Sequence, residues 1–249
     1  PRDNMTPLLA LGGLLGYLYD TQKTDLGHLD QLTWYRTGQY MELDLTARRN
    51  LELTETLRGK EKRGSLLWVL DKTKTAMGAR NLRAWLQQPL VDVAAIDRRL
   101  SAVAALAEHT VAREELTLAL SGIADMERLI GRVVYGSAGG RDLVSLRASM
   151  ERIPAVKAQL AAFPSGALHQ LDQQLEDLND LAALIGQTLV DEPPFSVREG
   201  EMIRDGFDPE VDRLRGILHG GKSFLAQMEA EEKEKTGIRT LKIGYNKVF

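Results

Sequence analysis

Apolar residues recur at intervals of three and four along most of this 249-residue chain, and this spacing is what most constrains its fold. Ile96, Leu100, Val103 and Leu106 form one such row, and Asp92 stands before it as a residue type that caps helix N-termini. Positions three or four apart lie on the same face of an α-helix. Aromatic residues make up only 6% of the chain, which favours helices over a sandwich or barrel. The sequence therefore predicts a mainly α protein.

The same spacing predicts further helices, and some of them have recognisable ends. Thr75 can cap a helix that Pro89 ends, and Asp208 followed by Pro209 starts a helix that we expect to reach about Lys235. A long row of leucines predicts one continuous helix over residues 168–189. The other expected helices cover residues 8–18, 66–70, 116–120, 126–130 and 143–153.

A few short strands and two turns complete the expected secondary structure. Residues 40–44 and 240–249 alternate between apolar and polar side chains, and we interpret both as strands. Residues 195–198 and 202–203 are interpreted as two shorter strands around a glycine turn. Glycines in residues 131–140 predict a turn between two helices, and the polar, glycine-flanked residues 58–64 predict another.

Composition excludes several classes of site. The chain has no cysteine, so disulfides, thiol nucleophiles and cysteine-bound metals are excluded, and a cytoplasmic location is consistent with this. Its four histidines are far apart in sequence and none has a close metal-ligand spacing, so we expect no metal site. The apolar run at residues 8–19 is too short to span a bilayer and lacks the basic flank of a signal peptide. We therefore expect a buried helix there and no membrane contact.

A phosphate-binding motif is matched to the letter between residues 216 and 223. Gly216, Gly221, Lys222 and Ser223 occupy the defining positions of the nucleotide-binding P-loop. That motif requires a hydrophobic strand before the glycines and a helix after them. Here the three- and four-residue spacing runs through the match without a break, so we expect the glycines within a helix or at a bend between two helices. We interpret the match as a decoy that binds no nucleotide.

Net charge is −3, so any nucleic-acid contact has to come from a local basic patch. The C-terminal segment supplies one: Lys235, Arg239, Lys242 and Lys247 occur with no acidic residue among them, and Asn246 lies between the last two. Such a segment can lie along phosphates without reading bases. Lysines also protect the exposed edge of a sheet. From the residues alone, both interpretations remain open.

Several ordered blocks resemble the MutS family of DNA mismatch repair proteins. The longest, residues 40–90, reads YMELDLTARRNLELTETLRGKEKRGSLLWVLDKTKTAMGARNLRAWLQQPL and is similar to the opening of that family's core domain. Shorter matching blocks cover residues 12–22, 125–129, 141–143 and 234–246. The resemblance implies a helix joining connector and core at 1–30, a multi-helical core or lever domain at 31–207, and the truncated beginning of a clamp domain at 208–249.

The function implied by this resemblance is mechanical. In the family, these helices hold a clamp over double-stranded, mismatched DNA and transmit its state to an ATPase domain. ATP and Mg²⁺ bind in that other domain, so we expect no cofactor and no enzyme activity here. No phenylalanine in the chain begins the Phe-x-Glu of the family's mismatch reader. The resemblance implies a bacterial, cytoplasmic protein that forms a homodimer and binds a MutL-like partner.

Under this resemblance, phosphate contact by Lys235, Arg239, Lys242, Asn246 and Lys247 becomes the favoured interpretation of the basic segment. Two alternatives to this lever and clamp function remain. One is a helical nucleotide-binding protein that uses residues 216–223, and the other is a helical scaffold that binds only protein.

Overall fold

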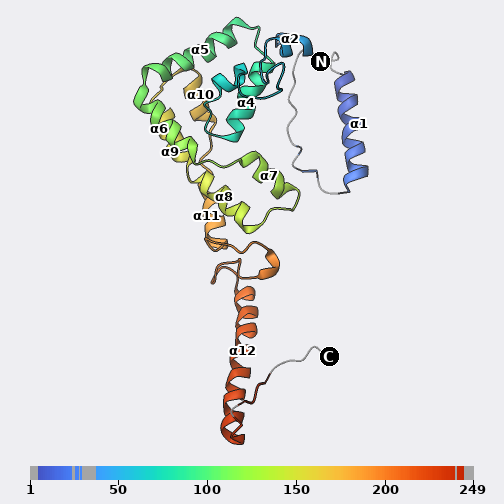
Figure 1. Cartoon of the computed structure of the whole chain (residues 1–249), viewed down its shortest axis with the longest axis vertical. Coiled ribbons are helices and arrows are strands. Elements are labelled where there is room, and N and C mark those ends of the chain that lie inside the picture. The colour runs from blue at the N-terminus through green and yellow to red at the C-terminus, as the bar shows by residue number, and fades with distance from the viewer. Residues whose placement is uncertain (1–4, 24–25, 28, 30–37, 239, 244–249) are drawn as a thin grey trace.

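Helices make up nearly all the regular structure of this protein, as expected from its apolar spacing. The computed structural model describes residues 5–23, 26, 27, 29, 38–238 and 240–243. A helical body carries one long helix that projects away from it (Figure 1). In chain order the helices are α1 (Met5–Gln22), α2 (Leu45–Asn50), α3 (Leu66–Leu70), α4 (Ala76–Gln87), α5 (Val93–Glu108), α6 (Thr110–Ser121), α7 (Met126–Val134), α8 (Gly140–Met150), α9 (Ile153–Leu160), α10 (Gly166–Gln174), α11 (Asn179–Thr188), the 3₁₀ helix η2 (Val197–Glu199) and α12 (Pro209–Thr236).

The predicted helix caps are confirmed. Thr75 Oγ1 accepts a hydrogen bond from the Gly78 N–H at 3.0 Å, and Asp92 Oδ1 accepts one from the Ala95 N–H at 2.7 Å. Asp208 Oδ1 accepts from two backbone N–H groups of the first turn of α12, at 2.8 and 3.0 Å. Each cap satisfies donors that a helix N-terminus leaves free, which is why α4, α5 and α12 begin where they do.

The body has two apolar cores, one above the other in the view of Figure 1. In the upper part α5 packs on α10 and α6 on α9, and in the lower part α8 packs on α11. The buried residues of the upper core are Val156, Leu160, Phe163 and Leu168. Those of the lower core are Leu129, Leu146, Met150 and Ala182.

The prediction of one helix over residues 168–189 is wrong, because the two cores divide it. The chain leaves the helical conformation between α10 and α11, and Leu178 there adopts the left-handed conformation with φ of 50°. Leu175 packs against the upper core and Leu178 against the lower one. The row of leucines is therefore continuous in sequence but contributes to two separate cores. The turn predicted at 131–140 is shorter than expected, since α7 continues through Gly131 to Val134.

Strands are the other departure from the sequence prediction. Within the described residues, β structure is limited to two isolated antiparallel bridges, Tyr40 with Leu90 and Leu189 with Ile203. Residues 41–44 form no strand, and 197–199 form η2. Residues 240–243 form a turn and an irregular segment, while 239 and 244–249 lie outside the described part. An alternating pattern makes a strand only where a neighbouring strand supplies hydrogen bonds, and no second full strand lies beside any of these segments in the described residues.

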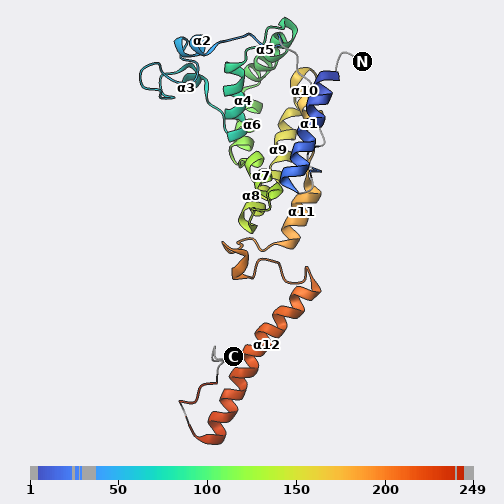
Figure 2. The ribbon, with the colours of Figure 1, turned by 90° about the vertical axis from the view of Figure 1, so that its right-hand side faces the viewer.

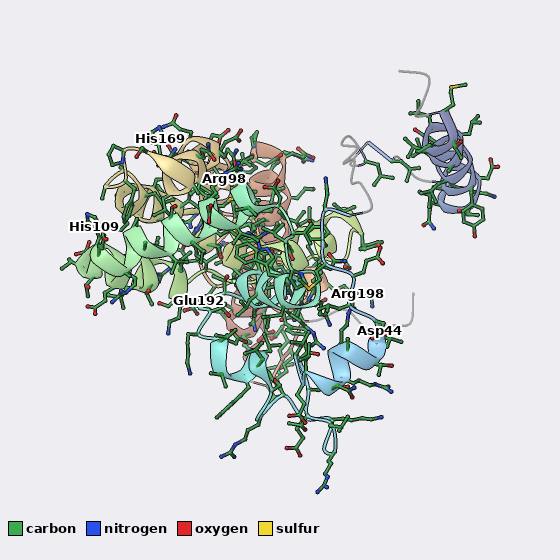
Figure 3. The ribbon with its side chains drawn as sticks, turned by 90° about the horizontal axis from the view of Figure 1, so that it is seen from above. Asp44, Arg98, His109, His169, Glu192 and Arg198 are labelled. Carbon is green, nitrogen blue, oxygen red and sulfur yellow. The ribbon has the colours of Figure 1, made fainter. Side chains whose placement is uncertain are left out.

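Helix α1 is exposed, contrary to the expectation of a buried helix. None of its residues is buried, and Figures 1 and 3 show it standing apart from the body. Its apolar side chains point in all directions, so it has no single face to place against a core. Among the described residues, no helix combines the length and apolarity needed to cross a lipid bilayer.

Candidate nucleic-acid interface

The predicted basic site lies at the far end of α12, away from the body. Helix α12 has 28 residues, which corresponds to a length of about 42 Å at 1.5 Å per residue. Figure 2 shows it leaving the lower end of the body without a second helix beside it. Gly237 ends it in the left-handed conformation with φ of 72°, and its N–H donates to the Lys233 carbonyl at 2.9 Å. Glycine adopts this conformation without the steric penalty of a side chain.

The chain turns back on α12 immediately after this cap. The Leu241 N–H donates to the Ile238 carbonyl at 3.2 Å, closing a tight turn. The Ile243 N–H then donates to Glu229 Oε2 at 3.1 Å, which ties the returning segment to the last two turns of the helix. Because of this contact, residues 240–243 lie beside α12 instead of extending beyond it.

Charged pairs at this tip neutralise two of its lysines. Lys233 Nζ lies 2.6 Å from Glu229 Oε1, as the sequence spacing of four predicts, and Lys235 Nζ lies 3.0 Å from Glu232 Oε1. The Lys233 ammonium holds the pKa of Glu229 below its usual value, and the Ile243 N–H makes a smaller contribution in the same direction. Lys242 is exposed and makes no ion pair within the described part of the chain. Lys242 is therefore the lysine of the described tip that no carboxylate pairs with.

The structure locates two of the five predicted contact residues. Lys235 and Lys242 lie at the same tip, and Arg239, Asn246 and Lys247 fall outside the described residues. Lys233 belongs to the same group, although the sequence interpretation began at Lys235. Its position, four residues after Glu229 and two before Lys235, is the sequence signal that places Lys233 in this group.

The P-loop match lies entirely within α12. The backbone of residues 216–223 is helical throughout, and the residues before it form the first turns of the same helix. A P-loop presents backbone N–H groups from an open loop between a strand and a helix. In a continuous helix the N–H groups beyond the first turn are bonded to carbonyls of the preceding turn. Segment 216–223 therefore lacks the backbone context of a phosphate-binding loop.

The described residues show no constellation typical of an enzyme or a metal site. No group of three or more metal-ligating side chains occurs among them. His109 lies between α5 and α6, where its Nδ1 is 2.9 Å from the Ala105 carbonyl oxygen, and His169 lies in α10 (Figure 3). His109 also packs edge-on against Phe163, with ring centroids 5.3 Å apart. These contacts are typical of a structural histidine.

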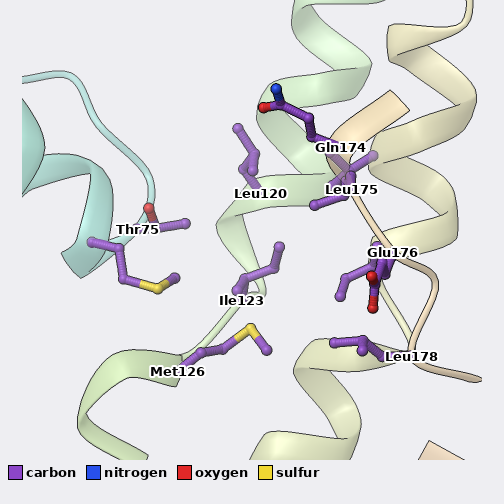
Figure 4. Close-up of a pocket in the computed structure, with 11 residues that line it drawn as sticks. Thr75, Leu120, Ile123, Met126, Gln174, Leu175, Glu176 and Leu178 are labelled. Carbon is purple, nitrogen blue, oxygen red and sulfur yellow. The ribbon is translucent and has the colours of Figure 1, made fainter. Parts of the chain in front are cut away.

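One apolar cavity of about 460 Å³ lies between the two cores. Figure 4 shows Leu120, Ile123 and Met126 on one side of it and Leu175 and Leu178 on the other. Gln174 and Glu176 are the polar groups at its rim, and Thr75 Oγ1 is already used in the cap of α4. No nucleophile and general base face each other across this cavity, so its lining offers no hydrolytic chemistry.

A mainly helical body with one long projecting helix defines a multi-helical protein of the mainly α class. Comparison with known proteins then gives the family. The family model described as MutS domain III matches residues 46–242. Proteins named DNA mismatch repair protein MutS align with the whole chain or nearly all of it: 49% identity over 248 residues in Desulforamulus reducens, 48% over 248 in Lachnoclostridium phytofermentans and 48% over 240 in Symbiobacterium thermophilum. The chain belongs to the MutS family.

The chain spans less than a third of these relatives, between 27% and 29% of their length. It corresponds to the domain III region of a mismatch repair protein. The match includes residues on both sides of the core–clamp boundary that we expect near residue 208, so that division stays a prediction.

Proposed function

We propose that this region is a non-catalytic lever with the beginning of a clamp, which contacts the DNA backbone at its tip and relays the state of the clamp to an ATPase domain elsewhere in the longer protein. The observation that carries this proposal is the geometry of α12. It places Lys235 and Lys242 at the end of a helix about 42 Å long, far from both apolar cores. A rigid helix transmits displacement of its tip to its base, whereas a flexible linker does not.

The DNA contact proposed is electrostatic and independent of sequence. The proposed contact groups are cations and one amide: Lys233, Lys235 and Lys242 in the described tip, with Arg239, Asn246 and Lys247 in the adjoining segment. The described tip has no aromatic side chain. Such groups bind phosphates and release the counterions condensed on the DNA, so the affinity for DNA falls steeply as the salt concentration rises. The partners proposed are double-stranded DNA, a second copy of the longer protein and a MutL-like protein, in the cytoplasm. ATP and Mg²⁺ bind in the ATPase domain.

A salt titration of duplex DNA binding tests this proposal. We expect Lys242→Ala to weaken binding and to reduce the slope of log K against log salt by about one, the value for the loss of one phosphate contact. Replacing Lys235, Arg239, Lys242 and Lys247 together with alanine should abolish most of the salt dependence. Lys74→Ala, at an exposed position on the body, is the matched control and should leave the slope unchanged. Equal slopes for Lys242→Ala and wild type would contradict backbone binding at this tip.

A second candidate function, a scaffold that binds only protein, is favoured by exposed apolar side chains on α1 and on the body. Leu9 in α1, Val103 in α5 and Leu118 in α6 are each more than 60% exposed. Apolar surface of this kind is typical of faces that contact other proteins or domains. The two candidates differ in the DNA titration, because a protein-only scaffold binds no duplex at any salt concentration.

A further inference from the structure

The apolar cavity between the two cores differs from the close packing on either side of it. We call it the intercore cavity, and its volume is about 460 Å³. Small-molecule sites typically measure about 300–1,000 Å³. Its lining comes from α4, α6, α7, α9 and the connection between α10 and α11, so the tertiary fold gives it its shape. Apolar walls hold water poorly, because an ordered water needs several polar partners.

The walls of the intercore cavity combine fixed aliphatic groups with adjustable ones. Ile153 and Val156 of α9 are buried, and Val156 belongs to the upper core. Met77 of α4 and Met126 of α7 are half-buried. Methionine is unbranched, so it adjusts to the shape of its neighbours, and its sulfur makes favourable contacts with aromatic rings. These walls therefore match a ligand with an aromatic body.

The connection between α10 and α11 forms one side of the cavity, and Lys157 of α9 holds it in place. Lys157 Nζ donates to the Leu175 carbonyl at 2.8 Å and lies 3.2 Å from Asp177 Oδ1. Leu178 follows with φ of 50°, a left-handed conformation that costs a residue with a side chain roughly 1 kcal/mol. Backbone strain of this kind persists only where surrounding contacts enforce it, and it is concentrated at ligand sites.

Glu176 gives the same side of the cavity a negative charge. Figure 4 shows Glu176 and Gln174 on the side of Leu175, and both are exposed. Within the described chain, the side chains of Glu176 and Gln174 make no hydrogen bond or ion pair, whereas Asp177 is paired with Lys157. Glu176 is also the one charged residue among the described residues that line the cavity. The cavity is therefore apolar inside and anionic at its edge.

The size of the cavity indicates a small molecule and not a docked helix. One turn of an α-helix with its side chains is about 5.4 Å long and 10–12 Å across, which corresponds to roughly 400–600 Å³. A single turn would fill the cavity, but helices that dock in grooves use anchors spread over two or more turns. An apolar cavity of about 150 Å³ already holds benzene, so about 460 Å³ accommodates a body of two rings.

We propose that the intercore cavity is a binding site for a small amine that carries a one- or two-ring aromatic body. The rings lie between Ile123 and Leu175, and the ammonium group stays at the edge, where the Glu176 carboxylate and the Gln174 carbonyl oxygen accept its hydrogen bonds. Because Glu176 is exposed, its charge adds only about two- to fivefold to the affinity. Most of the affinity comes from the buried rings.

A ligand in this position joins the two cores. Leu175 packs against the upper core and Leu178 against the lower one, and both line the cavity. A ligand that binds the folded state alone stabilises it in proportion to the logarithm of its concentration. The site goes beyond the proposed lever function and does not depend on it, since its lining includes no residue of α12.

Methionine methyl groups report binding directly. The chain has seven methionines, of which Met77 and Met126 line the cavity, while Met41 and Met228 are exposed elsewhere. The probe is 1-naphthylmethylamine, titrated into chain labelled with ¹³C at its methionine methyl groups. We expect saturable shifts at Met77 and Met126 with one dissociation constant on the order of 0.1–1 mM, and unchanged signals at Met41 and Met228.

The charge of the probe tests the role of Glu176. The anion 1-naphthaleneacetate has the same rings and should bind about two- to fivefold more weakly than the amine. Glu176→Gln should abolish this preference. Asp180→Asn is the matched control, because Asp180 is exposed and lies outside the lining. We expect Asp180→Asn to keep the wild-type preference.

Filling the cavity tests its position. Ile123→Trp should weaken binding of the amine more than tenfold, whereas Leu118→Trp, at an exposed position of α6, should leave it unchanged. Should Ile123→Trp fail to fold, as judged by circular dichroism, the methionine shifts and Glu176→Gln decide. Calorimetric titration of the longer protein with the same amine should give the same dissociation constant as this chain.

Three results would overturn the site. The first is an absence of shifts at Met77 and Met126, or equal shifts at Met41 and Met228. The second is equal affinity of the wild-type chain for the amine and the anion. The third is binding by this chain but not by the longer protein, which would mean that a segment of that protein fills the cavity.

Discussion

Arg80 and Asp125, 45 residues apart in sequence, form a two-pronged ion pair between α4 and the start of α7. Arg80 Nη1 donates to Asp125 Oδ2 at 2.8 Å and Nη2 to Asp125 Oδ1 at 2.6 Å. Arg80 also reaches Glu127 Oε2 with Nε at 3.0 Å and Nη2 at 2.6 Å. Asp125 is at the same time the N-cap of α7. Parallel guanidinium–carboxylate contacts fix orientation as well as distance, so this pair holds α4 in register with the lower core.

This pair predicts an acid-sensitive contribution to stability. The Arg80 guanidinium lowers the pKa of Asp125 from 3.8 to about 2. A carboxyl group whose pKa is lowered on folding stabilises the native state above its unfolded pKa, and this contribution is lost as pH falls through the folded pKa. We therefore expect Asp125→Asn, which can still cap α7, to be less stable than wild type at about pH 6 and to approach it between about pH 4 and pH 2. Urea unfolding at several pH values measures the difference; a difference independent of pH would contradict the assignment.

Nucleotide binding is the clearest test of the P-loop match. Because residues 216–223 lie in a continuous helix, we expect no saturable binding of ATP in the micromolar range by calorimetric titration, with or without Mg²⁺. Lys222→Ala should behave as wild type. Saturable binding that is lost in Lys222→Ala would establish a nucleotide site and revive the alternative function.

The lower core should respond strongly to loss of volume. Leu146 is 6% exposed and packs in the cluster with Leu129, Met150 and Ala182. Leu146→Ala should lower the free energy of unfolding by about 2–5 kcal/mol, the range for large-to-small changes in a packed core. Leu118 in α6 is 68% exposed, and Leu118→Ala should cost less than about 1 kcal/mol. Urea unfolding of both variants measures these changes in the free energy of unfolding. Similar losses in the two variants would mean that the Leu118 side chain is buried in solution.

A single lysine in the turn before α3 should be replaceable with a gain in stability. Lys60 has φ of 50°, in the left-handed region that side chains disfavour, and its side chain makes no hydrogen bond or ion pair in the described structure. Relief of this strain should make Lys60→Gly more stable by about 0.5–1 kcal/mol, after the loss of chain entropy that glycine brings. Lys72→Gly, at a nearby exposed residue without positive φ, should not be stabilising. A higher melting temperature for Lys72→Gly than for Lys60→Gly would contradict this reasoning.

Local features of the fold were predictable where the deciding interactions lie within a few residues. The caps at Thr75, Asp92 and Asp208 and the ion pair of Glu229 with Lys233 are such cases, since side chain and partner are at most four residues apart. The helical course of residues 216–223 follows from the same local spacing. For Lys235 a spacing of four points to Glu231, but the structure pairs it with Glu232, while Glu231 accepts from Gln227. Both spacings place the two side chains on one helix face, so the neighbours of each residue decide which pair forms.

The errors have one physical origin, which is that burial depends on partners distant in sequence. Helix α1 and the exposed residues Leu100 and Val103 carry apolar periodicity, yet in the described structure no helix covers them. Trp68 and Trp85 also lie on apolar rows of the sequence, yet they are 48% and 43% exposed, and the Arg99 guanidinium lies 3.5 Å from the centre of the Trp85 ring. Periodicity identifies a face that can be buried, but only tertiary contacts decide whether it is.

The sequence by itself determined the helical class of this protein, its family and the position of its helix caps, because each depends on residue type and spacing along the chain. Tertiary structure alone decided that the row of leucines divides at Leu178 between two cores, and that Arg215 of α12 donates to the Ile203 carbonyl. It also decided that the chain returns past Glu229, leaving Lys242 as an exposed lysine without an ion pair in the described tip. Contacts such as Arg80 with Asp125 join residues whose proximity only the folded chain creates, and no local pattern encodes which distant partner will satisfy a given charge.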